Sequence, residues 1–282
     1  MIESFHFNSF AKLNLQLIVQ GFRNEYHLLR MINTEIDLPD KIRGEFDLDV
    51  KKGKIIVETI PDLKIPMTKN LVYKALKAYF DLIEFTPYFK ITIKKSIPTG
   101  TGLGGGSSNA AYTILFLHSL FPVMAPANLI EFGASIGADV PFFIKGGVSQ
   151  VLGKGNILKP FKVNLKKYHF VLVIPKFRLS TTDVYHEFDR LKLPFDTSSI
   201  EVNEWMPLRN DLYVPAQNLE PQLSKVIMDI RKTRPIDVSM TGSGSACFGI
   251  FDNLLSAQSA CTILRGKYSK VLLAHAKETK NL

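Results

Sequence analysis

The segment Ile97–Phe121, "IPTGTGLGGGSSNAAYTILFLHSLF", joins a stretch of nearly bare backbone to an apolar run. Five of the seven residues from 100 to 106 are glycine, and Ser107 and Ser108 follow directly. Ordering glycine costs more backbone entropy than ordering any other residue, and a simple turn needs only one or two. The first N–H groups of a helix are unpaired and lie at the positive end of its dipole. We therefore interpret the segment as a phosphate-binding loop that leads into a helix near 107–108.

Three other interpretations of the glycines fit less well. No Lys-Ser or Lys-Thr follows them, as a Walker A loop requires. Gly100, Gly102 and Gly105 match the dinucleotide fingerprint, but the first acidic residue after them, Glu131, follows a helix rather than a second strand. A tight turn with Ser107 capping a core helix is the structural alternative, and it does not need so many glycines.

A few polar residues elsewhere have types that suit catalysis. Lys12 is the lone cation of the alternating strand "FAKLNLQLIV", and Asn14 shares its face because residues i and i+2 of a strand point the same way. Asp139 stands directly before "VPFF". By residue type alone, Lys12 also suits an exposed strand edge and Asp139 a turn before proline. Tyr26 and His27 also suit an amphipathic surface pair.

Composition limits the classes of protein. The 282 residues, 46% of them hydrophobic, are enough for one large domain or two smaller ones, and the net charge is +9. An anionic small substrate or a solvated basic surface explains this charge better than nucleic acid, because no basic run alternates with aromatic residues. Cys247 and Cys261 form no CxxC pair, so we expect two buried thiols in a reducing cytoplasm. The uncharged stretch 103–130 has too short an apolar part for a membrane span and predicts a buried helix.

Hydrophobic periodicity predicts the elements that position these residues. Strands are expected over 13–19 and 89–97, a helix over 70–83 capped by Asn70, and a short helix ending at Gly137. The second half predicts the succession strand, helix, strand, strand, helix, strand of a ferredoxin-like layer. We place the domain boundary near residue 165, giving domains 1–165 and 166–282. The polar stretch 189–205 is expected to be a loop.

The glycine segment resembles the ATP-phosphate loop of the GHMP kinase superfamily, P-x-x-x-G-L-G followed by small residues and serines. Within that superfamily, the chain resembles the 4-diphosphocytidyl-2-C-methyl-D-erythritol kinases over nearly its whole length. The matches, in order, are "FAKLNLQLIV", "NEYHLLR", "NLVYKAL", the "GGGSS" insertion, "GADVPFF", "LSTTDVY", "RNDLYVPA" and "MTGSGSACFGIF". The resemblance implies an α+β fold with two domains, the GHMP kinase fold: a ribosomal-protein-S5-like α/β domain, then a ferredoxin-like α/β layer.

The resemblance also implies an activity and the residues that carry it. The reaction would be ATP- and Mg²⁺-dependent phosphorylation of the 2-hydroxyl of 4-diphosphocytidyl-2-C-methyl-D-erythritol, in the non-mevalonate route to isoprenoid precursors. Asp139 would accept the hydroxyl proton, with Lys12 beside it. The residues implied in ATP binding are Pro98, Thr99, Gly100, Thr101, Gly102, Leu103, Gly104, Gly105, Gly106, Ser107, Ser108 and Asn70. Those implied in binding the cytidine diphosphate-linked substrate are Asn14, Tyr26, His27, Lys145, Tyr185, Gly242 and Gly244. Ser108 is a candidate contact for Mg²⁺, although no protein ligand set for the metal is implied.

Two alternatives stay open at this point. A related GHMP kinase for a mevalonate-type substrate would lack the set Tyr26, His27 and Tyr185, which the resemblance assigns to cytosine. A catalytically silent GHMP sensor would lack Lys12 or Asp139, and both are present. We expect a cytoplasmic monomer or weak homodimer that binds neither nucleic acid nor membrane.

The chain departs from the family pattern at several positions. Asn109 replaces the usual aspartate, a change from which we expect little effect. Asn24 and Glu25 replace the Asp-Gly before Tyr-His, which is expected to alter that loop. "GGVSQVLGKG" keeps its glycines but not the alanine and acidic residues common there.

Overall fold

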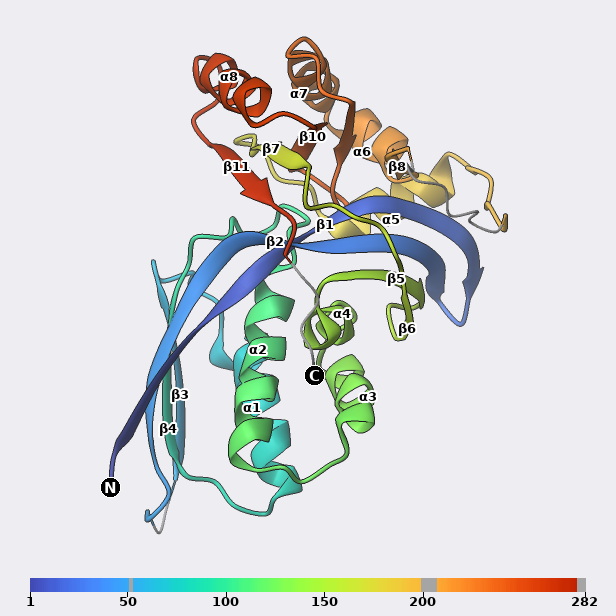
Figure 1. Ribbon diagram of the computed structural model, residues 1–282. Helices are drawn as coiled ribbons and strands as arrows, with labels where there is room; N and C mark the ends of the chain where they lie inside the picture. Colours follow the sequence, from blue (N-terminus) through green and yellow to red (C-terminus); the bar gives the residue numbers. More distant parts are fainter. Residues whose placement is uncertain (51–52, 199–206, 278–282) are drawn as a thin grey trace.

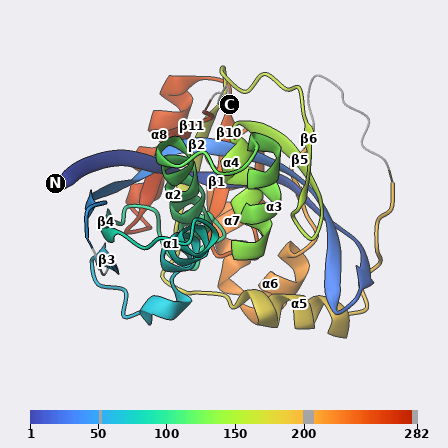
Figure 2. The ribbon, with the colours of Figure 1, turned by 90° about the horizontal axis from the view of Figure 1, so that it is seen from below.

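In the computed structural model, which describes residues 1–50, 53–198 and 207–277, the chain forms two β-sheets with helices packed on one face of each (Figure 1). The first sheet has the order β3-β4-β2-β1-β8, and β5 pairs with β2 and β6. Its strands are β1 (Glu3–Arg23), β2 (Tyr26–Asp47), β3 (Lys54–Ile60), β4 (Tyr88–Lys94), β5 (Val148–Gly153), β6 (Ile157–Pro160) and β8 (Arg209–Asn210). Figure 2 shows the helices that lie across this sheet: α1 (Leu71–Leu82), α2 (Gly105–Leu120), α3 (Pro126–Ile136) and α4 (Val140–Lys145).

The second sheet has the order β11-β7-β10-β9. Its strands are β7 (His169–Val173), β9 (Asp237–Met240), β10 (Cys247–Phe251) and β11 (Val271–His275), with α7 (Gln222–Arg231) and α8 (Leu254–Arg265) on its outer face. The predicted succession β7-α7-β9-β10-α8-β11 is confirmed, as is the α+β class. The helices α5 (Thr181–Arg190) and α6 (Tyr213–Leu219) interrupt it and were not predicted.

The long antiparallel pair β1–β2 runs between the second sheet and the helices α1–α4 (Figure 1). Side chains alternate between the two faces of β1, and the two faces contact different parts of the protein. Ala11, Leu13 and Leu15 pack against strands of the second sheet, in a core that includes Phe170 and Phe248. Side chains at even positions point to the opposite face, where Lys12 lies against Gly104 of the glycine loop.

The β1–β2 hairpin closes with a two-residue turn at Asn24 and Glu25, between the paired residues Arg23 and Tyr26. Both turn residues are left-handed, with φ of 50° and 62°. Asparagine tolerates this left-handed region, and glycine adopts it without strain. Glutamate is strained there. The departure from Asp-Gly therefore keeps the turn and adds strain at Glu25.

Several predicted features are confirmed, although β1 is much longer than the expected strand 13–19. The side chain of Asn70 caps α1 by accepting from the Val72 amide at 2.9 Å, and α3 ends before Gly137. Both cysteines are buried free thiols. The uncharged stretch forms α2, and in the described ranges no helix is long and apolar enough to cross a membrane.

The start of α2 was predicted too late. The helix begins at Gly105, and its N-cap is the left-handed Gly104 rather than Ser107. Two of the glycines thus form the first turn of the helix, and Ser107 and Ser108 lie within it. Of the expected loop 189–205, residues 189–190 end α5 and 191–198 are irregular, while 199–205 lie outside the described residues. The domain boundary near 165 stays a prediction.

Candidate active site

The glycine loop needs its glycines for conformation and for close packing. Gly100, Gly102 and Gly104 have φ of 64°, 79° and 71°, a region that L side chains rarely adopt. A Cβ on Gly102 would lie 2.1 Å from the carbonyl oxygen of Thr241. No larger residue fits at Gly102 without moving the backbone at Thr241.

Backbone hydrogen bonds hold the loop between the two sheets. The Lys12 amide donates to the Leu103 carbonyl at 3.0 Å, and the Ala246 amide donates to the Thr101 carbonyl at 3.3 Å. The Ser108 amide donates to Gly104 at 2.9 Å as the first bond of α2. The N–H groups of residues 105–107 therefore have no acceptor within the helix and lie at its positive end. This arrangement is suited to phosphate.

The glycine turn that joins the antiparallel strands β9 and β10, residues 241–246, packs directly on this loop. A Cβ on Gly242 would lie 2.9 Å from the Cα of Gly102. Asn210 fixes the turn by donating to the carbonyls of Met240 and Gly242, both at 2.8 Å. A hairpin and a contact with the phosphate loop are thus both features of one segment.

Asp139 is the N-cap residue of the short helix α4, yet its side chain makes no capping hydrogen bond. Its carboxylate is 35% exposed and lies 3.9 Å from Lys12 Nζ. It lies at the N-terminus of α4, beside the lysine charge. The carboxylate is therefore free to accept a hydrogen bond or a proton from a bound molecule.

Lys12 is almost fully buried. Burial lowers the pKa of its ammonium group, and the charge of Asp139 opposes that shift. Lys12 Nζ also donates to Asn14 Oδ1 at 2.5 Å. A desolvated cation beside a carboxylate can stabilise negative charge that develops on a nearby oxygen.

Asn14 is fully buried beneath Lys12, and other protein groups use its amide. Its Oδ1 accepts from the Gly242 amide at 2.7 Å, and its Nδ2 donates to Asn33 Oδ1 at 2.6 Å. Asn14 thereby connects Lys12 to the glycine turn of the second domain. Direct contact with substrate stays a prediction.

One cavity of about 400 Å³ gathers these groups. The predicted residues that line it are Lys12, Gly100, Gly102, Gly104, Ser107, Asp139, Tyr185, Gly242 and Gly244. The predicted residues outside its lining are Asn14, Tyr26, His27, Asn70, Pro98, Thr99, Thr101, Leu103, Gly105, Gly106, Ser108 and Lys145. Three of these residues are buried: Thr101 and Leu103 within the loop, and Ser108 in α2. Lys145 is the last residue of α4.

The aromatic residues assigned to cytosine lie beside this cavity. His27 stacks on Tyr185 with ring centroids 4.7 Å apart, and its Nε2 lies 2.8 Å from Asp189 Oδ1. Tyr26 is 57% exposed, and Lys154 Nζ lies 3.7 Å from its ring centroid. The hairpin tip and α5 therefore meet where a flat ring could be bound.

Several lining residues were missed from the sequence: Lys154, Gly155, Leu179, Thr181, Leu212 and Ser243. Thr181 Oγ1 and Ser243 Oγ lie 2.8 Å apart and join α5 to the glycine turn. Lys154 had a signal, since it stands between two glycines in "GKG". Thr181 and Ser243 lie within matched motifs but had no feature that distinguished them.

Comparison with known proteins identifies the family. Residues 70–147 match the model of the GHMP kinases N terminal domain. The 4-diphosphocytidyl-2-C-methyl-D-erythritol kinase of Clostridium perfringens (strain ATCC 13124) is 34% identical, over 97% of this chain and 99% of the relative. The chain belongs to this family of GHMP kinases. It is an ATP-dependent small-molecule kinase.

Other relatives agree. The GHMP kinase of the same name from Thermodesulfovibrio yellowstonii is 34% identical over 94% of this chain and 95% of its own length. A crystal structure of 4-(cytidine 5'-diphospho)-2C-methyl-D-erythritol kinase superimposes with a TM-score of 0.77, at 27% identity over 96% of this chain and 99% of the other. A mevalonate kinase structure, at 14% identity and a TM-score of 0.68 over 97% and 99% of the two chains, shows the shared fold alone.

In this GHMP kinase a buried carboxylate anchors the strand that enters the phosphate loop. Asp40 is fully buried and forms an ion pair with Lys95. Its Oδ1 accepts from the amides of Ser96 and Ile97 at 2.6 and 2.9 Å. Because β4 ends at Lys94, these two bonds fix the backbone immediately before the glycines.

Asn109 ties α2 to the same carboxylate. Its Nδ2 donates to Asp40 Oδ2 at 2.9 Å and to Ser9 Oγ at 2.6 Å, while its Oδ1 accepts from Lys95 Nζ at 2.9 Å. Both ends of the amide are thus used in a buried network. The departure from the family's usual aspartate therefore matches its surroundings in this chain.

We predict that Asn109→Asp destabilises the protein by about 2–3 kcal/mol at pH 7, because a donor is replaced by a second buried carboxylate facing Asp40. The crowded pair would raise the pKa of one carboxyl, so the loss should shrink as the pH falls towards 5. Urea unfolding at both pH values measures it, with Asn109→Ala as the uncharged control. A variant within 0.5 kcal/mol of wild type at pH 7 would contradict the role given to this network.

Proposed function

We propose that this kinase phosphorylates the 2-hydroxyl of 4-diphosphocytidyl-2-C-methyl-D-erythritol with ATP. The substrate is supported by the name of relatives 34% identical over nearly the full length. The chemistry is supported by one observation above all. The Nζ of the buried Lys12 lies 3.9 Å from the carboxylate of Asp139, and both residues line a cavity that the glycine loop also lines.

The proposed reaction uses these groups as follows. The substrate hydroxyl oxygen attacks the γ-phosphorus of ATP, the bond to the β-phosphate oxygen breaks, and the hydroxyl proton passes to Asp139. Lys12 pairs with Asp139 and stabilises the charge developing on the attacking oxygen. The N–H groups at the start of α2 bind phosphate oxygens of ATP and orient the γ-phosphoryl group.

The residues present fit a magnesium ion that arrives with ATP. Mg²⁺ in kinases is bound by one or two carboxylates together with substrate phosphates. Asp139 is the one acidic residue of the cavity lining, and Ser107 adds a hydroxyl. Ser108, the next residue of α2, has a buried Oγ without a hydrogen-bond partner among the described residues. When bound, the ion would neutralise charge on the phosphates.

An ATP-consumption assay with two acceptors tests the function. Purified protein is expected to turn over the cytidyl substrate with Mg²⁺ and to ignore mevalonate. Turnover of mevalonate without turnover of the cytidyl compound would reject the proposal. The assay with Asp139→Asn reports any contaminating kinase.

We propose that Tyr26, His27 and Tyr185 bind the cytosine ring, with Lys145, at the end of α4, near the cytidine end of the substrate. Tyr185 is largely desolvated, which raises the pKa of its hydroxyl, with a further contribution from Asp139. It therefore stays neutral and offers a ring face. His27 already stacks on that ring, so the imidazole and the base would share the space between the hairpin tip and α5.

Tyr26→Ala is expected to raise the KM for the cytidyl substrate about tenfold or more and to leave the KM for ATP within twofold. Losing one stacking platform costs about 1–3 kcal/mol, and the base is remote from the transferred phosphoryl group. Steady-state kinetics with each substrate varied in turn measures both constants. Tyr26→Phe is the matched control, since it keeps the ring. A rise in the KM for ATP alone would mean that the two nucleotides are placed the wrong way round.

A further inference from the structure

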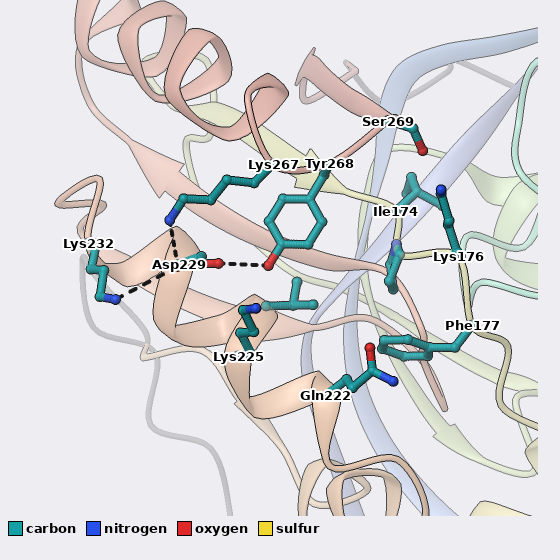
Figure 3. A pocket seen from close by; sticks show the side chains of 12 residues that line it. Ile174, Lys176, Phe177, Gln222, Lys225, Asp229, Lys232, Lys267, Tyr268 and Ser269 are labelled. Carbon is teal, nitrogen blue, oxygen red and sulfur yellow. Dashed lines mark hydrogen bonds and ion pairs between the residues drawn. The ribbon is translucent and has the colours of Figure 1, made fainter.

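A second and larger cavity, of about 910 Å³, lies in the C-terminal layer. It opens between the segment that follows β7, the helix α7 and the turn between α8 and β11 (Figure 3). It shares no lining residue with the cavity around Asp139. Its size is that of a small-molecule site.

The lining of this cavity is strongly basic. Four exposed lysines, Lys176, Lys225, Lys232 and Lys267, surround a single acidic residue, Asp229. In Figure 3 they come from the three different segments. Within the ranges that the structure describes, Lys176 and Lys225 have no hydrogen-bond or ion-pair partner. A concave surface with one sign of charge concentrates ions of the opposite sign.

Asp229 is a fixed part of the wall and pairs with two of the four lysines, Lys267 at 2.8 Å and Lys232 at 3.8 Å, leaving Lys176 and Lys225 uncompensated (Figure 3). It is 5% exposed, and its two oxygens accept from Lys267 Nζ at 2.8 Å and from the Tyr268 hydroxyl at 2.9 Å. Burial alone would raise the pKa of this carboxyl, but the two hydrogen bonds and the charges of Lys267 and Lys232 together lower it. One ionised carboxylate against four lysines leaves a net charge of +3 on the lining.

The cavity also offers apolar surface beside its charges. Phe177, Val226, Ile174 and Pro175 line it, and the hydrogen bond to Asp229 fixes the Tyr268 ring (Figure 3). A purely inorganic anion would leave this apolar surface unused. A ligand that places a charged group on the lysines and a ring on Phe177 would use both parts.

We propose that this cavity binds a small organic phosphate, with its phosphate group on the lysines and an apolar or aromatic group against Phe177 and Tyr268. Lys176 and Lys225 are the principal charge contacts, because neither has to give up a protein partner. The site is separate from the kinase centre, so a phosphorylated compound can bind here while the reaction site is filled.

Phenyl phosphate, inorganic phosphate and phenol are suitable probes, titrated into the ¹⁵N-labelled full chain with amide shifts followed by NMR. We expect phenyl phosphate to shift residues 174–177, 222–232 and 267–269, with a Kd at least about tenfold below that of inorganic phosphate. Added salt should weaken this binding. Because shifts are read residue by residue, binding at the phosphate loop is distinguished from binding here.

A matched pair of double variants tests the lysines. Lys176→Glu with Lys225→Glu is expected to raise the Kd for phenyl phosphate at these resonances at least tenfold. Lys74→Glu with Lys159→Glu makes the same change of charge at exposed positions outside this cavity and should leave the Kd within twofold. Kinase turnover should match wild type in both, since none of the four lysines lines the reaction cavity.

Four results would overturn the proposal. They are no shifts in these segments up to about 10 mM phenyl phosphate, equal affinity for inorganic phosphate, equal affinity for phenol, or an equal loss of binding in the control variant. The wild-type titration alone decides the first three, so the outcome does not depend on the folding of a variant.

Discussion

Asp139→Asn is expected to lower kcat by about 10²–10⁴-fold while ATP still binds. The substitution keeps the size of the side chain and removes its ability to take a proton, a contribution of this order in general base catalysis. We expect this substitution to change catalysis without disturbing the fold, because of the position of Asp139. Its side chain caps no helix, and among the described residues its carboxylate accepts no hydrogen bond and forms an ion pair with Lys12.

Single-turnover kinetics and ATP titration separate the two expected effects of Asp139→Asn. The matched control is Asp183→Asn, an exposed aspartate in the first turn of α5 outside the cavity lining. It should retain wild-type kcat. If Asp139→Asn kept kcat within threefold of wild type, Asp139 would take no part in the proton transfer.

The ferredoxin-like layer could be predicted because its signals are local. The strand "HFVLV" is a continuous apolar run, and the helix α7 has its apolar residues on one face. Each hydrophobic pattern lies within a single helix or strand and marks the side of that element that is buried in the core. The order of elements then limits the topology.

Other elements could not be predicted because tertiary pairing determines them. β2 contains Pro39 and a polar run that reads as a loop, yet β1 and β4 pair with it on either side. Its register with β1 shifts between Phe10 and Ala11, which breaks the alternation on which prediction depends. α5 begins with two threonines, which are poor helix formers, and its Ser180 cap was not recognised.

The candidate site was predictable in its residue types and only in part in its contacts. The glycines implied a close backbone approach, but the sequence did not show that Gly102 and Gly242 approach each other. Lys12 and Asn14 lie on the same face of β1, as alternation predicts. The burial of Lys12, however, depends on the loop that covers it, which the strand pattern does not show. Lys154 enters the cavity from a turn that is more than 100 residues from Lys12, and no local pattern reports such a distance.

Lys12→Met is expected to lower kcat about 10²–10³-fold and at the same time to raise the melting temperature. Loss of a preorganised charge at the reacting oxygen accounts for the first effect. The higher melting temperature follows from burial of the ammonium group, which lowers the pKa of Lys12 and so destabilises its charged form. Methionine has a similar length and loses no solvation there, so we expect a gain of about 1–2 kcal/mol.

Removing this lysine does not leave a buried partner unpaired. Asn14 Oδ1 still accepts from the Gly242 amide at 2.7 Å, and the Asp139 carboxylate reaches solvent. This distinguishes the site from a buried ion pair, in which loss of one partner is strongly destabilising.

The pH dependence of the Lys12→Met stabilisation has a definite sign. The folded state releases the Lys12 proton at a lower pH than the unfolded chain, so between the two pKa values the unfolded state holds more protons and wild-type stability rises with pH. The advantage of Lys12→Met is therefore full below the lowered pKa and narrows as the pH rises from there towards 10.5, the ordinary lysine value. Thermal unfolding at pH 7 and pH 9.5, with Lys154→Met as the exposed control, measures it. Equal or lower stability of Lys12→Met at pH 7 would show that the buried charge is fully compensated by Asp139 and Asn14.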